Sequence, residues 1–390
     1  MNRDIVIETA KRHACFYVYD GDGIRNTARE LSNALPDVDM LYSVKCNPHP
    51  QILATLAAEG YGADAASSGE VMRAAEAGMA AKDIYYSAPG KTLSDIRSTI
   101  GKATIVCDSL GEIERVCEAA RMLNSPLGIG IRLNPDFSFD GGCGAPSKFG
   151  IDESAAWQLM SSFHADHVTI DGIHIHLRSQ CLDMKAITRY FGLVLSLADR
   201  FCSHFGELSF VNMGSCIGIP GASDRPIDLK KLSGDVNVLL QNFRLRHPST
   251  RLLVETGRYV TGPHGIFVTK VLDRKESHGK TFLIVAGMLN GFLRPAIARW
   301  MGASGIRQGA EPLFTSQDAY TIRALGEGEP TERVTIAGNL CTSSDIVATD
   351  IPLPHLNVGD LLVINNAGAY AAALSPMQFS SGEKPIELFE

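Results

Sequence analysis

Short runs of hydrophobic residues alternate with longer amphipathic stretches between about residues 25 and 260. The short runs have the length of strands, and the stretches between them carry apolar residues at helical spacing. Strands are expected at 40–44, 61–65, 84–87, 104–107, 127–133, 168–176, 208–213 and 252–255. Helices are expected, among others, at 69–77, 110–123, 183–205 and 230–243. Strands that alternate with helices predict parallel βα units, and eight such strands predict a closed (β/α)8 TIM-like barrel.

The pattern changes after about residue 262. Short β-rich runs at 266–272, 281–286, 333–337 and 360–365 are separated by Gly, Pro and Asn, which predicts a second, mostly antiparallel β domain. The run 16–19 (FYVY) also has the composition of a strand and is expected to join this domain. The sequence therefore predicts an α/β protein with a barrel at 25–262 and a β domain made of 1–24 and 263–390. A doubly wound open sheet is the alternative, although no GxGxxG motif follows the first strand.

Composition and charge exclude several classes of function. The chain is 45% hydrophobic and 20% charged, as soluble globular proteins are. A net charge of -7 disfavours a nucleic-acid partner, and neither a membrane span nor a signal-like N-terminus is apparent. The nine cysteines form no CxxC pair, which argues against a disulfide framework or a zinc site. We therefore expect a cytoplasmic protein without a metal, a nucleic-acid partner or a membrane partner.

Four of the expected barrel strands end in residues that carry chemistry. Lys45 follows the first strand, Arg132 lies near the end of the fifth, His176 ends the sixth and Glu255 ends the eighth. Barrels of this type place their active sites at the C-terminal ends of the strands. Taken alone, Lys45 is better explained as a surface lysine and His176 as a core histidine. Together, an amine, a guanidinium, an imidazole and a carboxylate on one rim suit an anionic heteroaromatic cofactor.

Short motifs in a fixed order extend this pattern over nearly the whole chain. They are Tyr42-Ser43-Val44-Lys45-Cys46-Asn47-Pro48, Gly62-Ala63-Asp64-Ala65-Ala66-Ser67-Ser68-Gly69-Glu70, Ser147-Lys148-Phe149-Gly150, His174-Ile175-His176, Glu255-Thr256-Gly257-Arg258, Arg294-Pro295-Ala296, Cys341-Thr342-Ser343-Ser344-Asp345 and Gly368-Ala369-Tyr370. In these motifs the sequence resembles the fold-type III pyridoxal-phosphate decarboxylases, the group of diaminopimelate, ornithine and arginine decarboxylases. The resemblance implies the alanine racemase/decarboxylase fold, a barrel followed by a β domain.

The resemblance implies pyridoxal 5'-phosphate as the cofactor. Lys45 would hold it as a Schiff base, His176 would stack on its pyridine ring, and Glu255 would favour the protonated ring nitrogen. Backbone amides and a guanidinium suit the phosphate. The further cofactor-binding residues implied are Asp64, Arg132, Ser179, Gly214, Ser215, Gly257, Arg258 and Tyr370.

Members of the family are typically homodimers in which each active site is completed by the partner. Cys341 would then lie across the interface near the substrate Cα and donate a proton. Without the resemblance, Cys341 is better explained as one more buried thiol. The residues expected to bind an amino-acid substrate are Arg178, Arg294, Thr342 and Asp345.

Two departures from the family pattern bear on the function. The family's phosphate loop usually has three consecutive glycines, and the side chains in Gly214-Ser215-Cys216 are expected to loosen the phosphate grip. Relatives that act on free diamino acids usually follow the site cysteine with an acidic residue, where this chain has Thr342. A buried ammonium without a carboxylate partner is costly, which disfavours free diamino substrates unless Asp345 supplies that carboxylate.

The sequence therefore predicts a carboxy-lyase that is similar to diaminopimelate decarboxylase. Its expected substrate is a citryl- or carrier-linked amino acid on a route to a siderophore or an antibiotic. Decarboxylation of free meso-diaminopimelate for lysine synthesis is one alternative. A non-catalytic or regulatory homologue that binds the cofactor is another. A racemase is disfavoured, because racemases of this fold tend to place arginine against the ring nitrogen, where this chain has Glu255.

Overall fold

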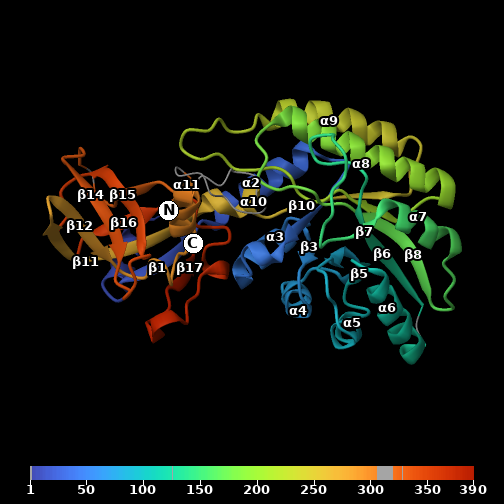
Figure 1. Cartoon of the computed structure of the whole chain (residues 1–390), viewed down its shortest axis with the longest axis horizontal. Coiled ribbons are helices and arrows are strands. Elements are labelled where there is room, and N and C mark those ends of the chain that lie inside the picture. Colours follow the sequence, from blue (N-terminus) through green and yellow to red (C-terminus); the bar gives the residue numbers. More distant parts are fainter. Residues whose placement is uncertain (1, 125, 305–318, 327) are drawn as a thin grey trace. The chain divides into compact units, whose positions relative to one another are not determined.

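The computed structural model describes residues 2–124, 126–304, 319–326 and 328–390, which form two compact units (Figure 1). The barrel unit consists of Arg25–Gly218 and Ile227–Gly257, and the β unit of Met1–Ile24, Ile219–Pro226 and Arg258–Glu390. The sequence predicted domains at 25–262 and at 1–24 with 263–390. Whether these domains fold independently stays a prediction.

Eight parallel strands close into a ring in the barrel unit. Hydrogen-bonded neighbours follow the order β5-β4-β3-β2-β10-β9-β8-β6, and β5 also pairs with β6. The strands are β2 (Asp39–Ser43), β3 (Gly62–Ala65), β4 (Ile84–Tyr86), β5 (Thr104–Cys107), β6 (Leu127–Asn134), β8 (Val168–His174), β9 (Phe210–Asn212) and β10 (Arg251–Thr256), and the short β7 (Ile151–Asp152) pairs with β6. The predicted closed barrel is confirmed, and the alternative of an open sheet is wrong.

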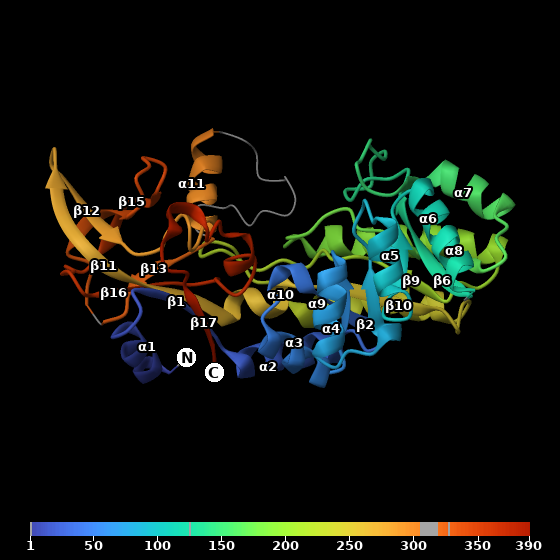
Figure 2. The same cartoon turned by 90° about the horizontal axis from the view of Figure 1, so that it is seen from below.

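Helices connect successive strands of the barrel, and α4, α5 and α6 contact one another in turn (Figure 2). Capping residues set where several helices begin: the side chains of Ser109, Asp183 and Asp228 accept backbone hydrogen bonds at the starts of α6, α8 and α9. The helices are α2 (Gly21–Ala34, which begins in the β unit), α3 (Pro50–Ala58), α4 (Ser68–Glu76), α5 (Leu93–Thr99), α6 (Leu110–Leu123), α7 (Glu153–Ser162), α8 (Met184–Phe205) and α9 (Leu229–Arg244).

Aromatic side chains fill the inside of the barrel. The Phe210 ring packs 4.9 Å from the Tyr85 ring. Glycine is required where the backbone passes this ring, because a Cβ at Gly172 would lie 2.3 Å from Phe210 and one at Gly130 would lie 2.6 Å from it. Phe210 belongs to a buried cluster with Leu41, Tyr85, Val106 and Leu253. The barrel is therefore a packed core, and its chemistry lies at the strand ends.

The β unit contains an eight-stranded sheet. Its main path runs β13-β16-β11-β12-β14-β15, and β1 joins β11 to β17. All pairings are antiparallel except β1 with β17 and β12 with β14, which confirms the mostly antiparallel second domain. The elements are α1 (Arg3–Ala10), β1 (Cys15–Tyr19), α10 (Arg258–Thr261), β11 (Gly265–Ser277), β12 (Lys280–Val285), α11 (Arg294–Ser304), β13 (Ile322–Ala324), β14 (Glu332–Gly338), β15 (Ile346–Leu353), β16 (Leu361–Ile364) and β17 (Ile386–Phe389).

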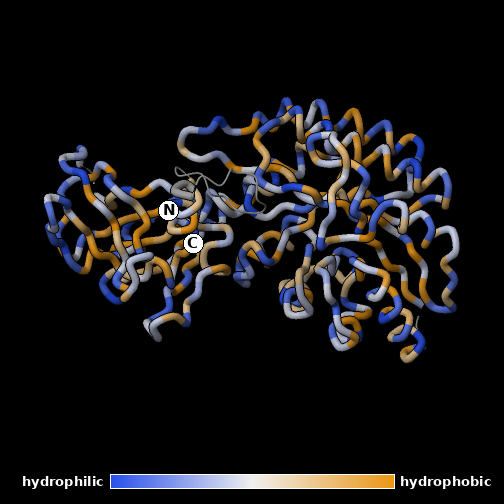
Figure 3. Tube along the Cα trace, viewed as in Figure 1, coloured by the Kyte–Doolittle hydropathy of each residue, from blue (hydrophilic) through white to orange (hydrophobic). Residues whose placement is uncertain are grey.

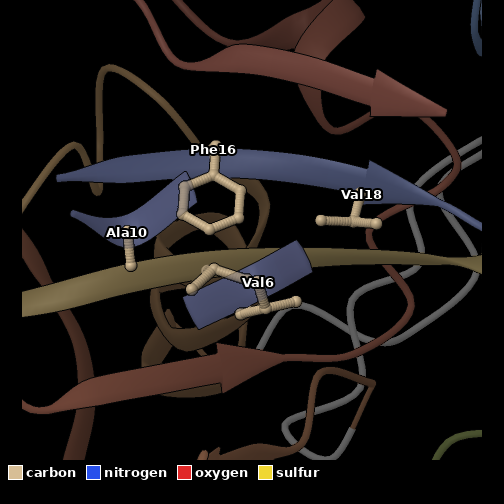
Figure 4. Packing of buried hydrophobic residues seen from close by; sticks show 5 residues of the cluster. Val6, Ala10, Phe16 and Val18 are labelled. Carbon is tan, nitrogen blue, oxygen red and sulfur yellow. The ribbon is translucent and has the colours of Figure 1, made fainter. Parts of the chain in front are cut away.

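The run expected at 16–19 is the central part of β1 and pairs with β11 in the sheet of the β unit. Val6 and Ala10 of α1 pack against Phe16 and Val18 of β1 and against Val268 (Figure 4). Hydrophobic positions concentrate in the strands of both units, while hydrophilic positions alternate with them along the helices (Figure 3). Burial of one helix stripe and of the strands is what the sequence pattern predicted.

A buried ion pair ties the segment after β4 to the start of α6. Lys91 Nζ lies 2.8 Å from Glu112 Oε2, and both side chains are almost completely buried. Lys91 Nζ also donates to the carbonyl of Val106 at 2.7 Å. The Glu112 carboxylate accepts the backbone N–H groups of Gly90, Lys91 and Asp108 at 2.6, 3.0 and 2.9 Å. Because each charge has several partners, removing one would leave the other buried without compensation.

We expect Glu112→Ala to lower the free energy of unfolding by about 3–5 kcal/mol, since Lys91 would remain buried as an uncompensated charge. Asp350→Asn is the control, because it breaks the exposed pair with Arg333 and should cost less than about 1 kcal/mol. Urea unfolding of both variants measures the difference. Equal losses would contradict the assignment of Lys91 and Glu112 as a structural pair.

Candidate functional site

Lys45 lies in the 3-10 turn Val44–Cys46, which directly follows β2. Its side chain is exposed, and its Nζ pairs with Oδ2 of Asp64, whose side chain is buried. Asp64 Oδ1 accepts a hydrogen bond from Ser87 Oγ at 2.6 Å, and Oδ2 accepts one from Ser43 Oγ at 3.0 Å. The hydroxyl groups hold the carboxylate in one orientation, and the carboxylate in turn orients the lysine amine.

Glu255 lies in β10, which pairs with β2 in the closed ring. Its Oε1 accepts a hydrogen bond from Asn212 Nδ2 at 2.9 Å and lies 3.1 Å from His174 Nε2. Its Oε2 lies 3.8 Å from His176 Nδ1. Burial alone would raise the pKa of Glu255, but His174, followed by His176 and Lys45, holds that pKa below its usual range. Glu255 is therefore a buried carboxylate that stays charged at neutral pH.

His176 lies just beyond the end of β8 and is held in one orientation. Its Nδ1 accepts the backbone N–H of Ser215 at 3.0 Å, and its Nε2 lies 3.2 Å from Ser179 Oγ. Burial lowers the pKa of His176 to about 4, although the Glu255 charge opposes this. The imidazole is therefore neutral at pH 7, with its proton on Nε2.

The segment that follows β9 begins with a left-handed glycine. Gly214 has φ of +66°, and a Cβ there would lie 2.6 Å from the carbonyl oxygen of Ile175. Ser215 and Cys216 do not have positive φ, so this backbone tolerates their side chains. Burial raises the pKa of Cys216 well above its usual value, so its thiol stays protonated. The weaker phosphate binding expected from Ser215 and Cys216, which stand where the family usually has glycines, stays a prediction.

Arg132 and Arg178 have partners of their own in the barrel unit. The Arg132 guanidinium stacks on the Phe149 ring at 4.3 Å. Arg178 donates two hydrogen bonds to Asp140, at 3.0 and 2.7 Å, and lies over the Phe139 ring at 4.7 Å. Arg178 therefore links the segment between β6 and β7 to the segment after β8. This pairing favours a role in loop positioning over the expected contact with a substrate anion, which stays a prediction.

Two arginines of the β unit lie against one tyrosine. The guanidinium carbon of Arg258 is 5.1 Å from the centre of the Tyr370 ring, and that of Arg294 is 5.4 Å from it. Arg294 is buried, and its Nε donates to the Tyr370 carbonyl at 3.3 Å. Tyr370 itself has φ of +54°, in the left-handed region.

In the barrel unit, Gly257 passes so close to Cys46 that a Cβ on Gly257 would lie 2.9 Å from the cysteine Cβ.

The remaining expected residues lie after β14 in the β unit. Cys341 is exposed. The Thr342 hydroxyl lies 3.3 Å from Ser344 Oγ. Asp345 is buried, and its two oxygens accept the backbone N–H groups of Leu289 and Leu340 at 2.9 and 3.0 Å. These bonds favour a structural role for Asp345 over the expected contact with a substrate ammonium.

Comparison with known proteins places the chain in a family. The model of the pyridoxal-binding domain of pyridoxal-dependent decarboxylases matches residues 22–262. The chain belongs to this family. The family match, together with decarboxylase relatives over nearly the whole chain, makes it a pyridoxal-phosphate-dependent carboxy-lyase that acts on an amino-acid-type substrate.

Its relatives include decarboxylases of two kinds of substrate. An L-glutamyl-[BtrI acyl-carrier protein] decarboxylase of Niallia circulans is 31% identical over 99% of this chain and 91% of its own length. A diaminopimelate decarboxylase of Helicobacter pylori is 29% identical over 96% of this chain and 89% of its own length. The crystal structure of the Helicobacter pylori diaminopimelate decarboxylase complexed with L-lysine is similar to the present fold, with a TM-score of 0.85 and 26% identity over 100% of this chain and 94% of that one.

The residues of this decarboxylase fit its cofactor chemically. Pyridoxal phosphate carries an aldehyde, a basic ring nitrogen and a phosphate. The barrel unit offers the exposed Lys45 amine, the charged Glu255 carboxylate and the backbone of the Gly214 turn at neighbouring strand ends. Among the residues described, no cluster of His, Cys, Asp and Glu could hold a metal ion. No helix in the described part of the chain is long and apolar enough to cross a membrane.

Several residues around this site were given no role from the sequence: Ser43, Ser87, Asp140, His174 and Asn212. A signal for His174 was available, because residues two apart on a strand point to the same side and His174 and His176 have that spacing. The sequence carries no comparable signal for Asp140, because its contact with Arg178 depends on how two loops fold.

The neutral state of His176 predicts how stability depends on pH. An unfolded histidine has a pKa of about 6.5, so between pH 6.5 and 4 the unfolded chain binds more protons than the folded one. Acidification through this window should lower the free energy of unfolding by up to about 1.4 kcal/mol per pH unit through His176 alone. His176→Gln should reduce this slope, and His164→Gln, which removes an exposed imidazole, should not. Urea unfolding from pH 6.5 to 4.5 without added cofactor measures both slopes, and identical slopes would contradict burial of a neutral His176.

Proposed function

We propose that this enzyme removes the α-carboxylate of an amino acid whose distal end is conjugated, and that Lys45 holds the cofactor. One juxtaposition supports the proposal: the exposed amine of Lys45 and the buried charge of Glu255 belong to strands β2 and β10, which pair side by side. The register pairs Glu255 with Leu41, so the two strands end together. An amine and a charged carboxylate on adjacent strand ends suit the two ends of a pyridoxal ring.

The side chains of the barrel unit have separable roles in this proposal. When bound, the cofactor supplies an electron sink for the charge left on Cα as carbon dioxide departs. Glu255 would hold a negative charge against the ring nitrogen and favour its protonated form. Neutral His176 would present a flat ring for stacking without adding a positive charge. Asp64 would keep the Lys45 amine oriented through its own bonds to serine hydroxyls.

Backbone amides and a guanidinium would hold the phosphate of the cofactor. Left-handed Gly214 turns the backbone after β9, and backbone amides that converge at such turns bind anions well. A guanidinium adds charge and directional donors. The residues that we assign to the phosphate and to the cofactor's surroundings are Arg132, Ser179, Gly214, Ser215, Gly257, Arg258 and Tyr370.

We also propose a homodimer with shared active sites. Exposed Cys341 supports this, since a thiol on the surface of one subunit is free to enter the site of its partner. There it would donate a proton to the substrate Cα. None of the nine cysteines forms a disulfide in the structure, which supports a reducing compartment and hence the proposed cytoplasmic location.

Two observations support a conjugated substrate. The position after the site cysteine is Thr342, and the nearby Asp345 carboxylate already accepts two backbone hydrogen bonds. A distal ammonium would find no available carboxylate at either position, whereas an acyl or amide linkage carries no charge to compensate. The relative from Niallia circulans acts, by its name, on a glutamyl group linked to a carrier protein. Arg294 would bind a carboxylate of the substrate.

Free meso-diaminopimelate is the second candidate substrate. The diaminopimelate decarboxylase of Helicobacter pylori, at 29% identity, favours it.

A screen of carbon dioxide release tests the proposal. The substrates are diaminopimelate, lysine, ornithine, arginine and glutamate, together with citryl-linked and carrier-linked forms, each with added pyridoxal phosphate. We expect the highest kcat/KM with a conjugated substrate, loss of turnover and of the bound-cofactor absorbance in Lys45→Ala, and unchanged behaviour in Lys82→Ala, which removes an exposed lysine. Preference for free diaminopimelate would overturn the substrate assignment, and turnover in Lys45→Ala would overturn the role of Lys45.

A further inference from the structure

We infer that His174, together with Asn212, is a positioning residue that fixes the charge and the orientation of the Glu255 carboxylate. Both residues are buried in the barrel unit, and both contact Oε1 of Glu255. The inference rests on the proposed role of Glu255 toward the ring nitrogen and adds the residues that make this role possible.

Strand register brings the three side chains together. His174 is the last residue of β8, and it pairs with Asn212, the last residue of β9. Strand β9 in turn pairs with β10, which carries Glu255. All three residues are buried, with exposed fractions of 1% for His174, 0% for Asn212 and 4% for Glu255. Three consecutive strand ends of the ring therefore place polar groups in one dry cluster.

The orientation of the Asn212 amide follows from its two bonds. Its Oδ1 accepts the backbone N–H of Gly214 at 2.9 Å, so its Nδ2 is the atom that faces Glu255 Oε1, also at 2.9 Å. The amide thus connects the left-handed glycine turn to the carboxylate. An aspartate at this position would be unable to donate and would place a second negative charge beside Glu255.

The buried His174 imidazole faces the Glu255 carboxylate. Its Nε2 lies 3.1 Å from Glu255 Oε1, while its Nδ1 is buried with no hydrogen-bond partner among the residues described. The Nε2 contact is a close electrostatic one rather than a well-aligned hydrogen bond. Two lone pairs at this distance would repel, so Nε2 carries a hydrogen. His174 therefore faces Glu255 with an N–H group.

The two contacts direct the carboxylate. Both Asn212 and His174 act on Oε1, whereas the described neighbour of Oε2 is His176 Nδ1 at 3.8 Å. The lone pair of His176 Nδ1 already accepts the Ser215 N–H, so this nitrogen does not donate to Oε2. Oε2 thus retains its capacity to accept a hydrogen bond from a protonated ring nitrogen.

The same contacts keep Glu255 ionised. Burial raises the pKa of the carboxyl, and the groups that lower it are His174, His176 on the segment after β8, and Lys45 on the turn after β2. His174 is the largest of these opposing contributions. Without it, the carboxyl would lose the largest contribution that opposes its protonation, and it would attract a protonated ring nitrogen less strongly.

Substitution of His174 with measurement of the cofactor itself tests the inference. In His174→Leu we expect kcat to fall by about 10- to 100-fold with little change in KM, because the buried Glu255 carboxylate would lose a close electrostatic partner. With 15N-labelled pyridoxal phosphate and no substrate, the ring-nitrogen NMR shift should move toward its unprotonated value. His174→Gln, which keeps an N–H donor, should recover part of both. The control is His247→Leu, since His247 is also buried and lies 2.7 Å from the Asp199 carboxylate but is outside this site.

An unchanged kcat and an unchanged 15N shift in His174→Leu would overturn the inference while leaving the proposed function intact. Wild-type protein that takes up no cofactor would overturn both. If His174→Leu does not fold, as thermal unfolding by circular dichroism would reveal, Asn212→Leu provides the test, because it removes the amide donor to Glu255 without adding a charge. That variant should shift the ring nitrogen in the same direction, and a wild-type shift in it would overturn the inference.

Discussion

A negative charge kept inside a protein core is the constraint on which this site depends. A carboxylate as buried as that of Glu255 ordinarily takes up a proton, because the interior solvates charge poorly. Here a histidine and an asparagine from the two preceding strands of the ring face it. The carboxylate therefore stays ionised although it is buried, and water does not screen its negative charge there.

Barrel closure explains how distant parts of the sequence meet at this charge. Among the strands of the ring, β2 comes first in the chain and β10 last, yet they are hydrogen-bonded neighbours because the ring closes between them. Lys45 follows β2 and Glu255 lies near the end of β10, so closure alone brings the amine and the carboxylate to adjacent positions. The tight approach of Gly257 to Cys46 occurs at the same junction. An open sheet would have left these residues at opposite edges.

The same chain uses a second buried charge for a different purpose. Lys91 and Glu112 neutralise one another completely and are saturated by backbone groups, so that pair fixes the positions of β4, β5 and α6. Asp64 lies between these extremes, since serine hydroxyls hold its carboxylate while it pairs with an exposed lysine. A carboxylate whose oxygens are all engaged, such as that of Glu112, suits a structural role. A buried carboxylate that keeps an oxygen available, as we propose for Glu255, suits a role toward the cofactor.

The sequence was sufficient for the fold because strands buried on both faces give uninterrupted apolar runs, and those runs predicted all eight barrel strands. It was less informative in the β unit, where β13, β15 and β17 are short, partly exposed or rich in polar residues. The pattern of strand ends singled out Lys45, His176 and Glu255, and the resemblance to a family gave them their expected roles; the structure places all three after or near the ends of barrel strands. The sequence did not predict the contacts of Asn212 or of Asp140, the partner of Arg178. These contacts depend on strand register and on loop conformation, which a local sequence pattern does not encode.

The site as proposed requires a covalent bond between Lys45 and the cofactor, and peptide mapping after borohydride reduction can detect that bond. The reduced linkage survives proteolysis, so mass spectrometry of the digested protein identifies the modified lysine. We expect one modified peptide, the one that contains Lys45. A label on another lysine, or none after incubation with excess pyridoxal phosphate, would contradict it.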